Sequence, residues 1–126
     1  MENSKCYCDT RLYFDNCCGL YLKNNQNAPT ALALMRSRFS AYVIKDADYL
    51  LATTHSSERK YYSKEDILNW AIANEWQQLE IISFTETTVA FKAYFLDEKK
   101  QPQIHYEFST FKLENGVWYY LEGKFE

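Results

Sequence analysis

Four cysteines stand near the N-terminus in two close pairs, Cys6 with Cys8 and Cys17 with Cys18. Thiolates bind zinc tetrahedrally at about 2.3 Å, and two pairs joined by a short loop can converge on one ion. The alternatives are a disulfide between Cys17 and Cys18, a disulfide between Cys6 and Cys17, or four free thiols. Because four cysteines fill every position around the metal, this pattern favours a structural Zn²⁺ ion over a catalytic one.

The segment that carries these cysteines, residues 1–25, is polar and short of aliphatic side chains, so it needs a metal or a cross-link to fold. The rest of the chain, residues 26–126, is long enough for one core. The whole chain has 126 residues, of which 47% are hydrophobic and 17% aromatic, and this composition excludes a disordered protein. We therefore expect a metal-stapled head at 1–25 and one packed domain at 26–126.

Charge and hydropathy limit the class of partner and the compartment. The net charge of -3 and the pI near 5.4 argue against general nucleic-acid binding, which usually requires a basic surface. The sequence has neither the roughly 18 apolar residues of a membrane span nor the order of a signal peptide. We expect a cytoplasmic protein, and reduced thiols there favour metal binding over disulfides. The oligomeric state is left open.

Three helices are predicted before residue 75, from capping residues and from apolar residues spaced three or four apart. The first starts within 27–30 and ends near Asp46. A short second helix follows over 47–51, and Ser63 with Asp66 resembles a capping box that opens the third. The stripe expected to be buried on the first helix consists of Leu32, Met35, Phe39, Tyr42 and Val43.

Four strands are predicted after the helices, over 79–84, 89–95, 105–113 and 117–125, because these runs are rich in β-branched and aromatic residues. Asn115 and Gly116 form a strong hairpin-turn signal between the last two strands. Helices followed by an antiparallel meander predict an α+β fold in which the helices pack on one face of a curved sheet.

The cysteine spacing C-x-C-x8-C-C resembles the SEC-C motif, the zinc-binding module found at the C-terminus of the SecA translocation ATPase and in many other bacterial proteins. This resemblance implies a structural zinc ion. The loop of that motif is usually rich in Gly, Ser and Lys, whereas residues 9–16 here carry no lysine. We therefore do not expect the contacts that SecA makes with the SecB chaperone, lipid and ribosomes to carry over.

Longer runs resemble the YchJ family of uncharacterised bacterial proteins. These runs are residues 34–39, 41–42, 46–50, 53–55, 75–76, the positions Glu107, Ser109 and Phe111, and residues 114–120. The family combines a SEC-C head with a domain like nuclear transport factor 2, a cone of helices against a bent antiparallel sheet. Some members carry a second SEC-C motif at the C-terminus. This sequence ends at Glu126 without one, so we expect no bivalent use of the motif.

Six polar residues within these runs are candidates for a pocket or a structural polar cluster: Arg36, Arg38, His55, Glu75, Glu107 and Ser109. Arg36 and Arg38 point about 200° apart on a helix, so both cannot serve one pocket equally. We expect one arginine to form a partly buried ion pair with Glu107 or, as second choice, Glu75. His55 is either a general base or, as a lone histidine after a helix, a hydrogen-bonding cap or surface residue, and no residue is assigned as catalytic.

Two functions follow from these features. The leading interpretation is a non-enzymatic interaction protein that displays a zinc knuckle to a protein partner of unknown identity. The alternative is a small-ligand-binding protein or acid–base enzyme that uses a cavity in the cone, with His55, Arg36 and Glu107 as candidates. A closed core favours the first interpretation, whereas an open cavity faced by His55 or Glu107 favours the second.

Overall fold

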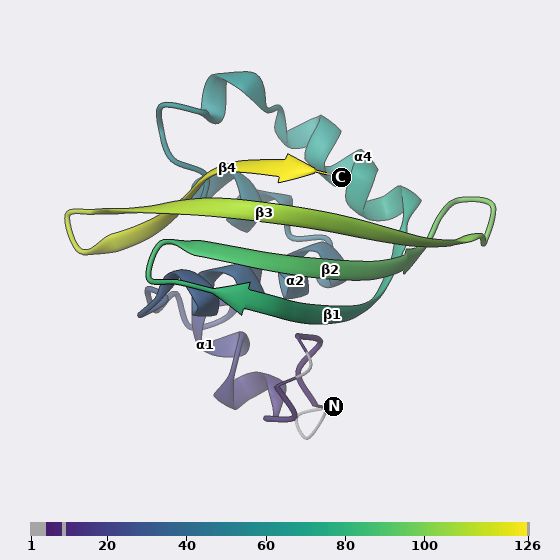
Figure 1. The fold of residues 1–126 in the computed structure, drawn as a ribbon, viewed down its shortest axis with the longest axis horizontal. Coiled ribbons are helices and arrows are strands. Elements are labelled where there is room, and N and C mark those ends of the chain that lie inside the picture. The colour runs from purple at the N-terminus through teal and green to yellow at the C-terminus, as the bar shows by residue number, and fades with distance from the viewer. Residues whose placement is uncertain (1–4, 9, 126) are drawn as a thin grey trace.

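The structure is a computed structural model that describes residues 5–8 and 10–125. Asp9, the first residue of the loop discussed above, lies outside the described residues, as do residues 1–4 and Glu126. The cysteine-bearing head contains two short helices, η1 (Phe14–Asn16) and α1 (Gly19–Leu22). Figure 1 shows this head at one end of the molecule, next to the edge of the sheet, and helix α4 at the opposite end.

Three longer helices follow the head, and all three begin where capping residues predict. Helix α2 (Ala31–Ile44) starts at Thr30, whose hydroxyl accepts a hydrogen bond from the amide of Ala33. Helix α3 (Ala47–Ala52) starts in the same way at Asp46, and α4 (Lys64–Ala73) starts at Ser63. A short turn of 3₁₀ helix, η2 (Arg59–Tyr61), lies between α3 and α4. The predicted helices are thus confirmed.

The four strands form one antiparallel meander in the order β1-β2-β3-β4. They are β1 (Glu75–Phe84), β2 (Thr88–Leu96), β3 (Pro102–Glu114) and β4 (Val117–Phe125), so the first three are longer than the apolar runs alone predict. Asn115 and Gly116 both have positive φ in the β3–β4 hairpin, as its turn signal requires. Register shifts in β1 and in the β3–β4 pair bend the sheet around α2.

Helix α2 lies between the sheet and the head, which changes the pattern of burial along it. Met35 and Phe39 are buried as predicted, but Leu34, Ser40 and Ala41 are buried too. The outer side of the helix is covered by the head, where Cys6 Sγ lies 3.6 Å from Ser40 Oγ. Of the predicted stripe, Leu32, Tyr42 and Val43 are only half-buried. An amphipathic stripe underestimates burial on a helix that is covered on two sides.

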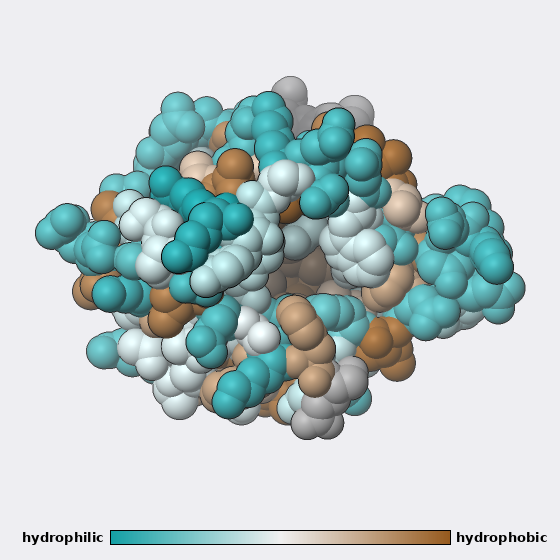
Figure 2. Space-filling view, turned by 90° about the horizontal axis from the view of Figure 1, so that it is seen from above, coloured by the Kyte–Doolittle hydropathy of each residue, from teal (hydrophilic) through white to brown (hydrophobic). Residues whose placement is uncertain are grey.

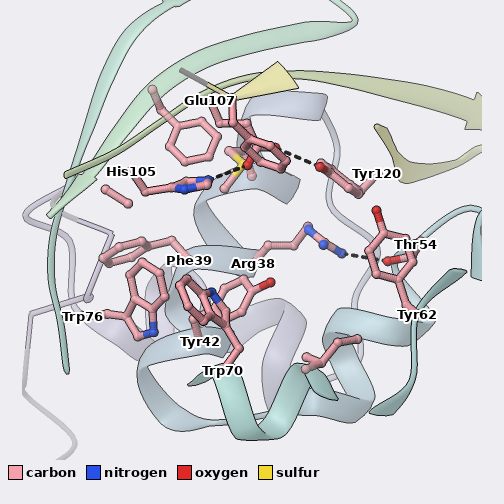
Figure 3. A pocket seen from close by; sticks show the side chains of 15 residues that line it. Arg38, Phe39, Tyr42, Thr54, Tyr62, Trp70, Trp76, His105, Glu107 and Tyr120 are labelled. Atoms are coloured by element: carbon pink, nitrogen blue, oxygen red, sulfur yellow. Dashed lines mark hydrogen bonds and ion pairs between the residues drawn. The ribbon is translucent and has the colours of Figure 1, made fainter. Parts of the chain in front are cut away.

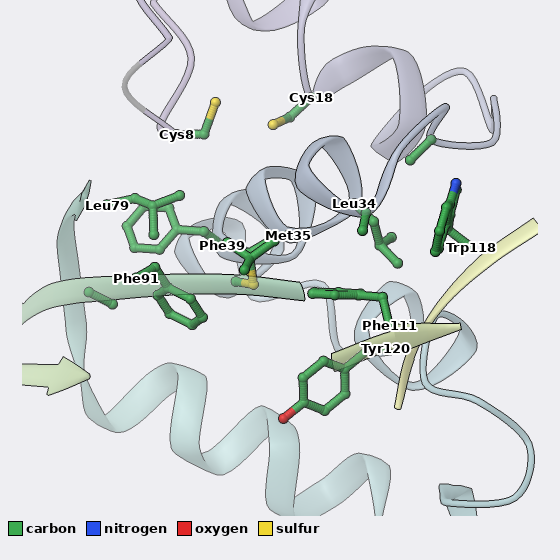
Figure 4. Packing of buried hydrophobic residues seen from close by; sticks show 14 of the residues in the cluster. Cys8, Cys18, Leu34, Met35, Phe39, Leu79, Phe91, Phe111, Trp118 and Tyr120 are labelled. Atoms are coloured by element: carbon green, nitrogen blue, oxygen red, sulfur yellow. The ribbon is translucent and has the colours of Figure 1, made fainter. Parts of the chain in front are cut away.

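The hydrophobic core runs without interruption from the head into the cone. Cys6, Cys8 and Cys18 belong to the same buried cluster as the α2 side chains and the inner face of the sheet. Figure 4 shows Cys8 and Cys18 on one side of α2, with Phe91 and Phe111 of the sheet on the other. The head therefore packs as part of the core rather than as a separate appendage.

The inner face of the sheet carries the polar residues expected there. Along β3, His105, Glu107 and Ser109 alternate on the face that packs toward α2, and Phe91 and Ala93 on β2 pair with Glu107 and His105. These two faces coincide, and Glu107 is buried as a result. No helix of the described residues is long and apolar enough to cross a membrane.

Candidate functional site

The four cysteine sulfurs of the head converge on one point. The Sγ atoms of Cys6, Cys8, Cys17 and Cys18 all lie within 4.8 Å of one another, and Cys8 and Cys17 Sγ are 3.6 Å apart. A tetrahedral zinc ion with bonds of about 2.3 Å requires sulfurs about 3.8 Å apart, so the cluster fits such an ion. All four are free thiols, and neither of the two disulfides considered above is formed.

The backbone of the head brings the two cysteine pairs together. The amide of Cys6 donates to the carbonyl of Leu12 at 2.7 Å, which folds the loop back on itself. Cys18 stands at the start of α1. Thr10 Oγ1 lies 3.2 Å from Cys17 Sγ, and Arg36 Nη1 donates to the carbonyl oxygen of Cys8 at 2.8 Å. Arg36 thus holds the cysteine loop from α2. Hydrogen bonds of this kind, made just outside the ligands, commonly orient the ligands of a metal site.

The close approach of the thiols shifts their pKa values in opposite directions. Hydrogen bonds from Cys18 and Cys8 lower the pKa of Cys6 far below that of an ordinary thiol. The hydrogen bonds with Cys6 and Cys8, followed by burial, raise the pKa of Cys18 far above it. A metal ion binds cysteines as thiolates, so a cation held by these four sulfurs would displace their protons.

A second feature is a cavity of about 280 Å³ between α2, α4 and the inner face of the sheet. Figure 2 shows the mouth of the cavity as a hollow near the centre of the molecular surface seen in that view. Figure 3 shows the side chains that line the cavity. Most of the wall is aromatic, and its rings are those of Phe39, Tyr42, Tyr62, Trp70, Trp76, Phe91, Tyr120 and Phe125. Small-ligand sites are typically apolar cavities of this kind with a few convergent polar groups.

Glu107 is the acidic group of this cavity, and its carboxylate forms hydrogen bonds with three neighbouring side chains. Its Oε1 lies 2.8 Å from His105 Nε2, and its Oε2 accepts from Ser109 Oγ at 2.5 Å and from the Tyr120 hydroxyl at 2.8 Å. Burial raises the pKa of Glu107, but the hydrogen bonds from His105, Ser109 and Tyr120 outweigh it and hold the pKa below the ordinary value. Glu107 is therefore a buried, ionised carboxylate.

Gly123 on β4 provides the space that Glu107 occupies. It pairs with Ser109 across the β3–β4 ladder. A Cβ atom at this position would lie 2.0 Å from Glu107 Oε2 and 2.5 Å from the Tyr120 hydroxyl. A glycine is needed here because of this close approach.

Arg38 is the buried cation of the cavity, and it binds neutral groups. Its Nη1 donates to the carbonyl of Leu50 at 2.8 Å and to Thr53 Oγ1 at 2.7 Å, with Thr54 Oγ1 at 3.5 Å. The guanidinium carbon lies 4.4 Å from the centroid of the Tyr120 ring. The burial predicted for one of the two arginines is found, and it falls on Arg38.

The predicted ion pair between an arginine and Glu107 or Glu75 is wrong. Within residues 5–8 and 10–125, neither Arg36 nor Arg38 forms an ion pair with a carboxylate. Glu107 takes its hydrogen bonds from the sheet, and Tyr120 bonds it while lying against Arg38 (Figure 3). Glu75 is exposed, and its Oε1 lies 3.4 Å from Lys100 Nζ.

His55 does not line the cavity. It is buried after α3, where its Nε2 lies 2.9 Å from Glu114 Oε1 and its Nδ1 lies 2.8 Å from Ser57 Oγ. Its amide donates to the carbonyl of Tyr120 at 2.8 Å. This arrangement is the hydrogen-bonding role considered above, and it ties the α3–η2 connection to the last hairpin. Arg36 on α2 is directed at the cysteine loop and does not line the cavity either, so Glu107 alone remains of the three cavity candidates.

Two residues of the cavity, His105 and Tyr120, are not among the candidates predicted from the sequence. His105 has no motif around it, and no feature of the sequence singles out Tyr120 among the aromatic residues of 114–120. The alternation His105, Glu107 and Ser109 along one strand is a signal that points to His105. Tyr120 reaches Glu107 from β4, where it pairs with Phe111 beside a register shift between Thr110 and Phe111, and no sequence signal predicts that shift.

Helices that enclose a cavity against a bent four-stranded meander, with a four-cysteine knuckle at one end, define an NTF2-like domain with a SEC-C-type head. The chain belongs to the YchJ family, because the family model described as "YchJ, middle NTF2-like domain" matches residues 30–123. The resemblance drawn from the sequence is thereby confirmed.

Individual relatives agree with this assignment. A UPF0225 protein of Enterobacter sp. (strain 638) is 40% identical over 124 residues, which cover 94% of this chain and 81% of the relative. The solution structure of a SEC-C motif containing protein from Rhodopseudomonas palustris has a TM-score of 0.87 and 33% identity, covering 95% of this chain and 97% of the other. A crystal structure of a SEC-C motif containing protein from Psychrobacter arcticus has a TM-score of 0.82 and 32% identity, covering 96% of this chain and 82% of the other.

Proposed function

We propose that this protein binds a small ligand in the cavity of its NTF2-like domain and that a structural zinc ion holds the head in place. The observation that carries the proposal is the cavity of about 280 Å³, which has aromatic walls and is faced by Glu107 and Arg38. An open cavity faced by Glu107 is the feature that favours ligand binding over a purely structural core.

The composition of the cavity supports binding of a compound smaller than a drug-sized molecule. Its volume falls just below the usual range of about 300–1,000 Å³ for such sites. Rings at the rim leave it open, since Trp70 is 47% and Phe125 63% exposed. The side chains of Arg38 and His105 supply hydrogen-bonding groups that would orient a ligand.

The ligand proposal is tested by backbone-resolved NMR with phenol, indole and phenylacetate as probes. We expect at least one probe to shift the amide signals of Ala93 and His105, which line the cavity. Ala93→Leu would fill part of the cavity and should remove the shifts. Ala52→Leu, the same change at an exposed position, should leave them intact. Shifts confined to the outer surface, or unaffected by Ala93→Leu, would contradict the proposal.

Within this proposal, Cys6, Cys8, Cys17 and Cys18 hold one Zn²⁺ ion. Their close approach supports this assignment, and four protein ligands leave no position for water or substrate, so the ion would stabilise the fold. The site requires reduced thiols, and we therefore propose the cytoplasm as the compartment. We also propose the division into a SEC-C head at 1–25 and an NTF2-like domain at 26–126. Elemental analysis of protein purified without chelator should give one zinc per chain, and a ratio near zero would contradict the assignment.

A non-enzymatic role with a protein partner is the second candidate function. It is favoured by apolar side chains that the head exposes, since Tyr7 is 41%, Leu12 53% and Tyr13 44% exposed. Affinity capture from cell extract, with and without chelator, tests this role against a Leu12→Ser variant. A partner that is retained by the Leu12→Ser variant or in the presence of chelator would contradict a role for the head.

A further inference from the structure

The cavity contains a buried positive charge, that of Arg38, which no carboxylate of the described residues pairs with. Arg38 is only 6% exposed, yet the groups that it contacts are a carbonyl, hydroxyls and the Tyr120 ring, all of them uncharged. Buried charges in proteins are normally paired with an opposite charge. Among the described residues that line the cavity, Glu107 is the sole carboxylate, and it forms no ion pair with Arg38.

Glu107 does not offset this charge because its oxygens are already occupied. Oε1 is bonded to His105, and Oε2 accepts from both Ser109 and Tyr120. Figure 3 shows Glu107 on the sheet and Arg38 on α2, with the guanidinium of Arg38 directed toward Thr54 rather than toward Glu107. The negative charge is thus compensated within the sheet, whereas the positive charge of Arg38 is not.

Arg38 also has hydrogen-bond donors to spare. Its Nη1 makes all of the hydrogen bonds found for this side chain, so Nε and Nη2 donate to none of the described residues. Trp76 Nε1 is the single side-chain atom among those residues that is both fully enclosed and without a partner. Nε and Nη2 are therefore not fully enclosed, on a side chain that lines the cavity, and together they offer the two parallel donors that a carboxylate accepts.

We propose that the cavity takes a small aromatic monocarboxylate, whose carboxylate is bound by Arg38 and whose ring packs against the aromatic wall. This inference rests on the proposed function and names its ligand class. One arginine matches one negative charge, and the carboxylate of Glu107 disfavours a second. The rings of Phe39, Trp70 and Trp76 supply apolar and edge-to-face contacts for an aromatic group.

The test uses three probes of one shape and different charge: phenylacetate, phenylacetamide and 2-phenylethylamine. Titration followed by NMR should show phenylacetate binding roughly 10–100-fold more tightly than phenylacetamide, with the amine weakest. Arg38→Met should abolish the preference of the cavity for the acid over the amide. Arg59→Met is the matched control, because Arg59 donates to the carbonyls of Thr54 and Ala52 without lining the cavity. It should keep the preference.

Arg38→Lys is a second variant, for the case that Arg38→Met does not fold. It keeps the positive charge but removes the planar pair of donors, so it should weaken the preference for the acid over the amide severalfold. Equal affinity for acid and amide, or an unchanged preference in a folded Arg38 variant, would overturn the anionic class. If phenol or indole still shifts the cavity signals, the proposed function stands and only the ligand class fails. If no probe shifts them, the proposed function fails as well.

Discussion

The hydroxyl of Tyr120 on β4 donates a hydrogen bond of 2.8 Å to Glu107 Oε2 on β3, inside the cavity of the cone. The same Tyr120 ring lies against the guanidinium of Arg38 on α2. One side chain therefore connects the buried carboxylate of the sheet with the buried cation of the helix, and both charges are held without an ion pair between them.

Removing the Glu107 carboxylate should destabilise the protein. Glu107→Ala leaves Ser109 and Tyr120 without the acceptor that they share, and we expect a loss of ~3 kcal/mol in the free energy of unfolding. Chemical denaturation measures it. Glu80→Ala is the control, because Glu80 also accepts from a tyrosine, Tyr94, but is exposed, and it should cost less than about 0.5 kcal/mol. Equal costs for the two variants would contradict a structural role of Glu107.

The contribution of Glu107 should depend on pH. Its folded-state pKa is lowered, so its contribution is complete above the ordinary pKa of a glutamate and is lost as the pH falls through the folded value. The difference in unfolding free energy between wild type and Glu107→Gln should be constant above about pH 6 and shrink as the pH falls below about 4.3. Urea denaturation across this range measures the difference. A gap that widens on acidification would show that the sign is wrong.

Gly123 should tolerate no side chain while Glu107 is present. Gly123→Ala places a Cβ atom against Glu107 Oε2, and we expect a loss of ~2 kcal/mol. In the Glu107→Ala background, the same change should cost less than half as much, because the clash with Oε2 is gone. Gly116→Ala serves as control, since only its φ of +79° opposes a side chain there and its cost should not depend on Glu107. Additive costs of Gly123→Ala and Glu107→Ala would contradict the predicted clash.

Loss of the metal site should weaken the cone as well as the head. Cys8→Ser should release zinc and disorder the head, while the cone still unfolds cooperatively at a midpoint lower by on the order of 10 °C, because Cys6, Cys8 and Cys18 share its core. Differential scanning calorimetry and elemental analysis measure both effects. Thr10→Val, which removes a hydroxyl beside Cys17 but no ligand, should retain zinc. An unchanged midpoint in a zinc-free Cys8→Ser variant would show that the head is not part of the core.

Signals between residues close together in the sequence were enough to predict the helices and strands of this protein. The caps at Thr30, Asp46 and Ser63 act within one helical turn, and the turn at Asn115 and Gly116 depends on the φ that these residues accept. The spacing of the cysteines likewise predicts their convergence, because the ligands lie close together along the chain.

The partners of the buried charges depend on contacts between distant segments. Alternation along β3 places Glu107 on the inner face of the sheet. Its partner Tyr120 comes from the neighbouring strand β4, and Arg38 donates to neutral acceptors such as the carbonyl of Leu50 on α3. The extra burial of α2 has the same origin, since the head folds back over residues such as Ser40, far along the chain. Helix and turn propensities carry no information about such pairings, so the cavity and its unmatched cation appear only in the folded molecule.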